Sequence, residues 1–285
     1  MKNKHYLLLL IAIVMASCSA DDITENPDPV ENELTLQRVV TYQPSKEFYD
    51  NSTTALWAAK TVQYFEDGLI VADSTFNKVH DLESVTVRTA RATSASEITY
   101  NRDNIAENTI LYTYDGNGRV TELSVSSPSV NYAKTVVYTA TGSATVTYHD
   151  PVSGSSQVLG TYMPNENGIL SNFNAANENE SLVFQDNKPI TYIQTTMGSF
   201  TTINMEYYDV PVPANRLKTA TQINNITLTG TLLESVANNS DHYLKSIHNV
   251  YSYSHTFNSL NYIEHSMFYD LIDLRTVETF YYYNE

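Results

Sequence analysis

Cysteine is almost absent from this chain of 285 residues, and its single thiol, Cys18, lies near the amino terminus. A domain without further cysteine forms neither an internal disulfide framework nor a zinc site built on thiolates. Basic residues are also scarce, because 16 Lys and Arg stand against 32 Asp and Glu, which gives a formal net charge of -16. Such a charge repels phosphate backbones, so we expect no nucleic acid partner.

Catalytic signatures are absent as well. The sequence contains no nucleophile elbow, no phosphate-binding loop, no complete dinucleotide fingerprint and no zinc-protease helix. Asp115 and Asn117 have the spacing of the first ligands of a calcium loop, but no third acidic ligand follows, which favours a turn. Four late histidines do not occupy positions i and i+2 of one strand, so we expect no metal site and no cofactor. These histidines are His242, His248, His255 and His265.

The amino-terminal residues have the pattern of a secretory signal. Lys2 and Lys4 supply positive charge, an apolar run follows over residues 7–14, and small residues come directly before Cys18. This segment resembles a bacterial lipoprotein signal, although Met15 stands where leucine is usual. The resemblance implies a signal peptide over residues 1–17 and an acylated, palmitate-bearing Cys18 that attaches the protein to a membrane. In the alternative, the signal is an ordinary cleaved one and Cys18 is incidental.

Residues 18–33 are expected to form the lipidated cysteine and a flexible tether. The segment is polar and acidic, contains two prolines and has too few apolar residues to fold. Its opening, with Asp21 and Asp22, resembles the acidic signal that follows the lipidated cysteine in surface-exposed lipoproteins of the Bacteroidota. That resemblance implies an outer membrane lipoprotein that faces the cell exterior, with Asp21 and Asp22 as export signal. The alternative is that the segment is only an acidic linker, because any such linker would have this composition.

Residues 34–285 have the composition of a single all-β domain. In the whole chain Tyr is abundant at 22 residues, against 9 Phe and 1 Trp, and Thr and Asn are frequent, which favours strands and turns. Apolar and polar residues alternate over residues 144–148 and 251–257, as in antiparallel sheets with one covered face. We expect only one or two short helices, at residues 51–59 and 232–236.

The clearest hairpin runs over residues 111–121. Two tyrosines on one strand face precede a turn whose residues tolerate positive φ, and Gly-Arg-Val follows. The unit resembles the YD repeat of RHS-type proteins, which implies a hairpin geometry and little about activity. The residues that carry the resemblance are Tyr112, Tyr114, Asp115, Gly116, Gly118 and Arg119.

Degenerate copies of this unit follow at similar spacing. Five aromatic residues, separated by 24, 24, 22 and 23 positions, are Tyr114, Tyr138, Tyr162, Phe184 and Tyr207. Such a period corresponds to two strands and two turns, so we predict one hairpin per unit in an antiparallel β-meander that forms a curved or superhelical sheet. Val120 and Leu123 lie three apart, which predicts a bulge or a strand covered on both sides.

Two classes of function remain. The favoured one is a non-catalytic, surface-anchored module, because tyrosine rings stack and Asn and Thr side chains hydrogen-bond on a glycan or a cell-surface protein. The alternative is an envelope hydrolase that acts on carbohydrate, which needs two carboxylates about 5 to 9 Å apart. Glu206, Glu264 and Glu278 are candidates for that pair, and the sequence does not choose among them.

Overall fold

The computed structural model describes residues 34–51, 59–186, 188–213, 232, 240, 242–248 and 250–284. The chain divides into two units, Met1–Glu33 and Leu34–Glu285, and only the second contains described residues. Cys18, Asp21 and Asp22 therefore lie outside the described residues. In the described part of the chain, no helix is both long and apolar enough to cross a bilayer.

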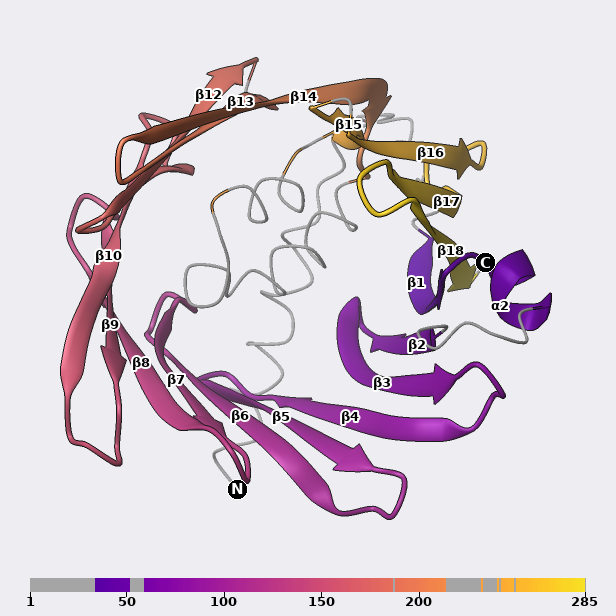
Figure 1. Ribbon diagram of the computed structural model, residues 1–285, viewed down its shortest axis with the longest axis horizontal. Helices are drawn as coiled ribbons and strands as arrows, with labels where there is room; N and C mark the ends of the chain where they lie inside the picture. The colour runs from indigo at the N-terminus through magenta and orange to yellow at the C-terminus, as the bar shows by residue number, and fades with distance from the viewer. Residues whose placement is uncertain are drawn as a thin grey trace, which may run out of the picture. The chain divides into compact units, whose positions relative to one another are not determined.

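Eighteen strands form one sheet in the unit Leu34–Glu285 (Figure 1). Each strand pairs in antiparallel fashion with the next one along the chain, so the hairpin meander predicted from the sequence is confirmed. The strands are β1 (Thr35–Gln43), β2 (Ala59–Glu66), β3 (Leu69–Asn77), β4 (Leu82–Ala90), β5 (Ser94–Asn101), β6 (Ala106–Tyr114), β7 (Val120–Ser126), β8 (Asn131–Tyr138), β9 (Ala144–His149), β10 (Ser156–Pro164), β11 (Leu170–Asn174), β12 (Glu178–Gln185), β13 (Lys188–Thr196), β14 (Ser199–Pro211), β15 (His242–Ile247), β16 (Tyr251–Phe257), β17 (Ile263–Asp270) and β18 (Arg275–Asn284).

The sheet closes on itself because the first strand pairs with the last. β1 pairs with β18 from Thr35, opposite Asn284, to Tyr42, opposite Glu278, and its other edge pairs with β2. The expectation of a superhelical sheet is therefore wrong, since the meander is a closed barrel (Figure 1). Closure pairs the two edge strands that an open sheet would expose. A hairpin repeat in the sequence does not indicate whether its first and last strands pair.

Helix is scarce, as the composition predicts. α2 (Lys46–Asn51) has six residues and ends where a helix was expected to begin. Residues 52–58 lie outside the described residues, and Ala59 already belongs to β2. In the second predicted stretch Leu232 is helical, and residues 233–236 lie outside the described residues.

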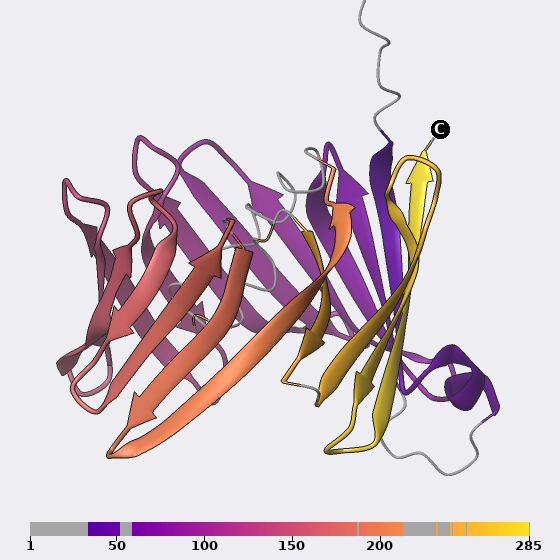
Figure 2. The same cartoon turned by 90° about the horizontal axis from the view of Figure 1, so that it is seen from above.

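The turns alternate between the two ends of the barrel because neighbouring strands are antiparallel (Figure 2). Turns from an odd-numbered strand to the next even one lie at the end that carries α2, which we call the α2 rim. Turns from an even-numbered strand to the next odd one lie at the end where β1 begins and β18 ends, which we call the β1 rim.

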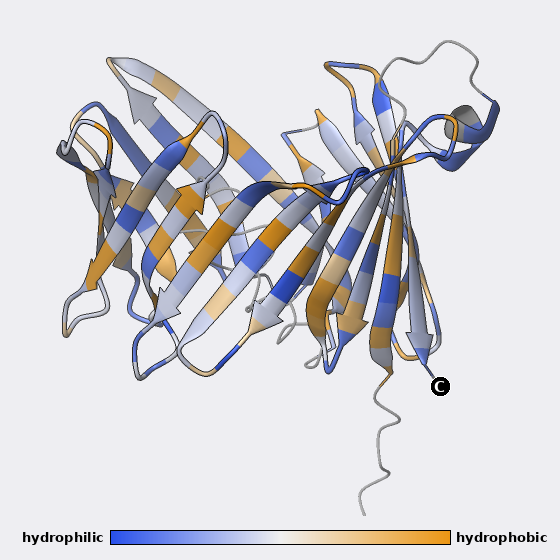
Figure 3. Ribbon diagram, turned by 90° about the horizontal axis from the view of Figure 1, so that it is seen from below, coloured by the Kyte–Doolittle hydropathy of each residue, from blue (hydrophilic) through white to orange (hydrophobic). Residues whose placement is uncertain are grey.

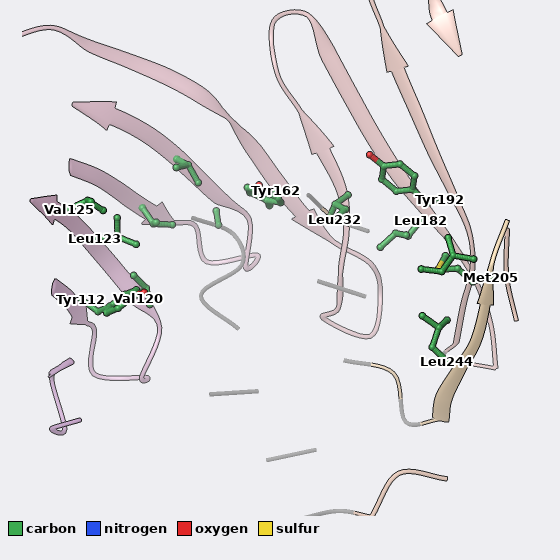
Figure 4. Close-up of a cluster of buried hydrophobic side chains, with 14 residues drawn as sticks. Tyr112, Val120, Leu123, Val125, Tyr162, Leu182, Tyr192, Met205, Leu232 and Leu244 are labelled. Carbon is green, nitrogen blue, oxygen red and sulfur yellow. The ribbon is translucent and has the colours of Figure 1, made fainter. Parts of the chain in front are cut away.

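The largest hydrophobic core lies on the inner face of β6–β15 (Figure 4). Hydropathy alternates along these strands (Figure 3), and cross-strand pairs such as Tyr112 with Leu123 place the apolar residues on one face. Leu123 is completely buried, whereas Leu111 on the opposite face of the barrel wall is half-exposed. Val120 is also buried because the β6–β7 register shifts beside it, which confirms the predicted bulge.

The five spaced aromatic residues lie on successive even-numbered strands, one for each hairpin. All five belong to, or pack against, the same core. The period in the sequence is therefore the distance along the chain from one inner-face aromatic to the next. These residues are Tyr114 on β6, Tyr138 on β8, Tyr162 on β10, Phe184 on β12 and Tyr207 on β14.

Candidate functional site

Seven aromatic side chains, His255 among them, gather along β14–β17, and we call them the aromatic cluster. The centroid of the His255 ring lies 5.3 Å from that of Tyr208, 5.9 Å from that of Tyr243 and 6.0 Å from that of Tyr253. The alternation of β16 brings its four aromatic residues to one face, as the sequence predicts. The cluster consists of Tyr208, Tyr243, Tyr251, Tyr253, His255, Phe257 and Phe268.

Backbone hydrogen bonds fix the orientation of two rings in the cluster. The Tyr208 hydroxyl donates to the carbonyl of Tyr253 at 2.9 Å, and the Tyr243 hydroxyl donates to the carbonyl of Asn261 at 3.2 Å. Burial raises the pKa of Tyr253 to about 12, so its hydroxyl stays neutral at physiological pH. The cluster therefore offers uncharged, pre-oriented ring faces, which suit stacking on an apolar or carbohydrate surface.

His255 has one ring nitrogen with a partner and one without. Its Nε2 lies 3.0 Å from the carbonyl oxygen of Leu244, which assigns the proton to Nε2 as a donor. Its Nδ1 is buried and has no hydrogen-bond partner among the described residues. Burial lowers the pKa of His255, against the opposing effect of the bond to Leu244, so the imidazole is neutral. Nδ1 is thus a buried hydrogen-bond acceptor that no described residue satisfies, and aromatic rings surround it.

A network of ion pairs and hydrogen bonds connects side chains of the neighbouring strands β3, β4, β5 and β6. Arg88 binds Asp73 and donates from Nε to Glu97 at 3.2 Å, and the Tyr112 hydroxyl donates to Glu97 at 2.9 Å. Burial, and after it the charge of Glu97, raises the pKa of Tyr112. Arg88 pairs with both carboxylates, Asp73 and Glu97. This arrangement is typical of an ion-pair network with a structural role.

Glu180 is the most buried glutamate of the described chain, with 5% of its surface exposed. Its carboxylate accepts the backbone amide of Leu232 at 2.8 Å. Burial, and after it the charge of Glu180, raises the pKa of both Tyr162 and Tyr192, to about 12 for Tyr162. Sequence reasoning missed Glu180, although its position two residues before Leu182 on an apolar strand face was a usable signal.

The three glutamates considered for hydrolysis lie on three different strands. Glu206 on β14 is exposed and pairs with Lys245 at 3.5 Å. Glu264 on β17 is exposed, whereas Glu278 on β18 binds His265 at 3.0 Å and the Lys46 amide at 2.7 Å. Strands β15 and β16 separate Glu206 from the other two, so the structure does not gather the three acids into one site.

The candidate metal ligands are likewise dispersed. No three His, Cys, Asp or Glu side chains within the described ranges lie close enough to share a metal ion. His242 begins β15, and His248 lies in the following turn with a φ of 53°. His255 belongs to the aromatic cluster and His265 pairs with Glu278.

The predicted repeat turn is held together by the carboxylate of Asp115. One oxygen accepts the amides of Asn117 and Arg119, both at 2.9 Å, and the other accepts the Arg119 guanidinium at 2.7 Å. These bonds, led by the one from the Arg119 amide, lower the pKa of Asp115. The carboxylate is thus occupied by the turn itself. Gly118 has a φ of 75°, which only glycine adopts freely, whereas the φ of Gly116 is not positive.

The remaining repeat residues connect this turn to the next hairpin. The Arg119 guanidinium lies 4.2 Å from the ring centroid of Tyr138, and the Tyr138 hydroxyl donates to the carbonyl of Val120 at 3.0 Å. Tyr112 and Tyr114 lie on the inner face of β6 and contribute to the core. Arg119 therefore joins neighbouring hairpins through Tyr138, and Tyr112 and Tyr114 have a structural role in the core.

Comparison with known proteins finds a similarity among solved structures. No protein-family model matches the sequence, and no curated protein is significantly similar to it. Among solved structures, a porin-like protein from Bacteroides uniformis is similar over 87% of this chain and 98% of its own length. Its sequence identity to this chain is 8% and the TM-score is 0.45.

Proposed function

We propose that this chain is a lipid-anchored, non-catalytic binding protein whose barrel binds a neutral glycan at the aromatic cluster. The observation that carries the proposal is the buried, unpartnered Nδ1 of His255 among oriented rings. A sugar hydroxyl is a donor that suits this acceptor, and sugar faces stack on Tyr and Phe. The half-buried Asp73 and Glu97 and the buried Glu180 already have partners, which favours binding over hydrolysis.

The attachment to the outer membrane belongs to the same proposal. A spanning barrel needs an apolar outer band on all sides, but here the outer face of β9–β13 carries mostly hydroxyl and amide side chains, with Val158, Val183 and Ile193 among them. This polar wall favours attachment through acylated Cys18, with Asp21 and Asp22 directing the protein to the cell exterior. The outward side chains include Thr145, Thr147, Thr161, Asn172, Asn174, Asn179, Ser181 and Thr195.

Glycan binding is tested with the full chain on a glycan array, followed by titration of the best ligand. His255→Phe keeps an aromatic ring but removes the acceptor, so we expect affinity to fall about tenfold. Ser254→Ala, on the outer face of the same strand, is the matched control and should bind like the wild type. Absence of any glycan ligand for the folded protein would reject the proposal, and release of shortened sugar products would establish the hydrolase instead.

Cys18→Ala should leave the protein unacylated and recoverable in the soluble fraction after washing. Stable anchoring takes two or more acyl chains, and no other segment of the sequence offers an acylation site, because Cys18 is the only cysteine. Fractionation before and after a wash at high dilution, with and without detergent, measures the effect. A mutant that still needs detergent for release would contradict anchoring through Cys18.

A further inference from the structure

Exposed apolar side chains are much more frequent at the turn tips of one rim of the barrel than at those of the other. On the α2 rim, Val152 is 86% exposed, Met197 83% and Leu274 84%. Six of the eight turns from β3–β4 to β17–β18 on this rim carry at least one such residue. On the β1 rim, the described turns carry only Ile169 and Leu260 as large exposed apolar residues. The exposed tip residues of the α2 rim are Val79, Ile105, Val130, Val152, Met197, Leu271, Ile272 and Leu274.

Turn formation does not require these apolar residues, because the same turn geometry occurs on both rims. Val79 on the α2 rim donates its amide to Asn77 Oδ1 at 3.0 Å. Asn117 on the β1 rim donates its amide to Asp115 Oδ1 at 2.9 Å, from the same position of the turn. A polar residue therefore satisfies this turn, and the choice of valine leaves an apolar side chain in solvent without any benefit to folding.

The tips are also held in fixed positions. The amide of Val152 donates to Asp150 Oδ1 at 2.8 Å, and that of Ile272 donates to Asp270 Oδ1 at 3.0 Å. Because hydrogen bonds already hold these turns in one conformation, binding through their side chains costs little further conformational entropy of the backbone.

The arrangement of the tips fits a lipid surface better than a protein. Successive hairpin tips are two strands apart, roughly 10 Å, and polar residues separate them. A protein interface needs a contiguous buried centre, whereas a bilayer accepts separate insertions at its interface. α2 contributes Lys46, Glu47 and Asp50, and the turns from β3–β4 to β17–β18 hold two basic residues against four acidic ones, so attraction to anionic lipid is not the driving force. The charged residues of these turns are Lys78, Arg102, Asp81, Asp103, Asp150 and Asp273.

We infer that the α2 rim is a membrane-docking surface whose apolar tips insert reversibly into the interface of a zwitterionic bilayer. The choice of a lipid surface rests on the proposed anchoring at Cys18, which keeps the barrel near a membrane. The sixteen residues 18–33 span at most roughly 55 Å when extended, and a strand of nine residues such as β10 is about 30 Å long. The segment that precedes β1 is therefore long enough for the α2 rim to reach the membrane.

The test uses the full chain with Cys18→Ala, so that no acyl chain contributes, and phosphatidylcholine vesicles. We expect this protein to co-float with concentrated vesicles and to be released on dilution. Leu271→Ser combined with Leu274→Ser should weaken the partition roughly tenfold or more. Ile169→Ser combined with Leu260→Ser, on the β1 rim, is the matched control and should leave it unchanged.

These experiments test docking by the α2 rim independently of anchoring through Cys18. Equal partition of the two double variants, or no partition of the parent chain, overturns docking by the α2 rim. Sedimentation velocity shows whether the parent chain self-associates. A dimer that the Leu271 and Leu274 changes dissociate, without vesicle binding, would assign the rim to a second copy and overturn the inference. Failure of Cys18 acylation in cells would contradict the anchor but would not alter the vesicle result.

Discussion

Replacing Gly160 with alanine is expected to destabilise the barrel by about 3 kcal/mol. Gly160 lies on β10, two residues before Tyr162, and the side chain of Phe173 from β11 occupies the space that a Cβ at Gly160 would need. A Cβ at this position would overlap the Phe173 ring and lie 2.7 Å from the carbonyl oxygen of Asn174. The ring has little room to retreat, because its centroid is 4.5 Å from that of Tyr162. Chemical denaturation of the purified protein measures the change.

Gly116→Ala is the matched control for this substitution. A Cβ at Gly116 would meet no atom within 4 Å, and its φ is not positive, so its stability should stay close to that of the wild type. Combining Gly160→Ala with Phe173→Leu should cost less than the sum of the single changes, because the smaller side chain removes the overlap. Additive costs, or an unchanged midpoint for Gly160→Ala alone, would contradict the packing described at this site.

The sequence predicted what is local in this fold. Alternation around Tyr253 and the spacing of Tyr114 and Tyr138 indicated antiparallel hairpins, since strand period and turn chemistry act over a few residues. Closure could not be predicted, because the contact between β1 and β18 joins residues such as Thr35 and Asn284, 249 positions apart. A local sequence pattern does not indicate which strands pair when so many residues separate them.

The candidate site was predicted only in part, for a related reason. The alternating aromatic residues of β16 were identified, but Tyr208 and Tyr243 join them from β14 and β15 through a bulged register. A bulge changes which face a side chain occupies, so sequence position alone does not place these rings beside His255. The partnership of Glu180 with Leu232 was missed because it spans 52 residues.

Raising the pH above 10 is expected to unfold the protein steeply. Burial is the leading cause that raises the pKa of four core tyrosines, to about 12 for Tyr162 and Tyr253. In the unfolded chain these hydroxyls titrate near pH 10, so above that pH the unfolded state binds fewer protons than the folded state. Stability is therefore fully present below pH 10 and is lost as the pH rises toward 12. The four residues are Tyr112, Tyr162, Tyr192 and Tyr253.

The slope of this loss has an upper bound of about 1.4 kcal/mol per pH unit for each tyrosine, and it is smaller where part of a ring reaches solvent. Tyrosinate absorbance and circular dichroism, followed together from pH 9 to 12, distinguish early from late titration. Tyr112, Tyr162, Tyr192 and Tyr253 should ionise only together with the loss of the fold. Tyr162→Phe should reduce the slope between pH 10 and 12, because phenylalanine keeps the packed ring but cannot ionise. A Tyr162→Phe protein with the wild-type slope, or wild-type tyrosines that all ionise in one early step while the circular dichroism is unchanged, would contradict the burial of these hydroxyl groups.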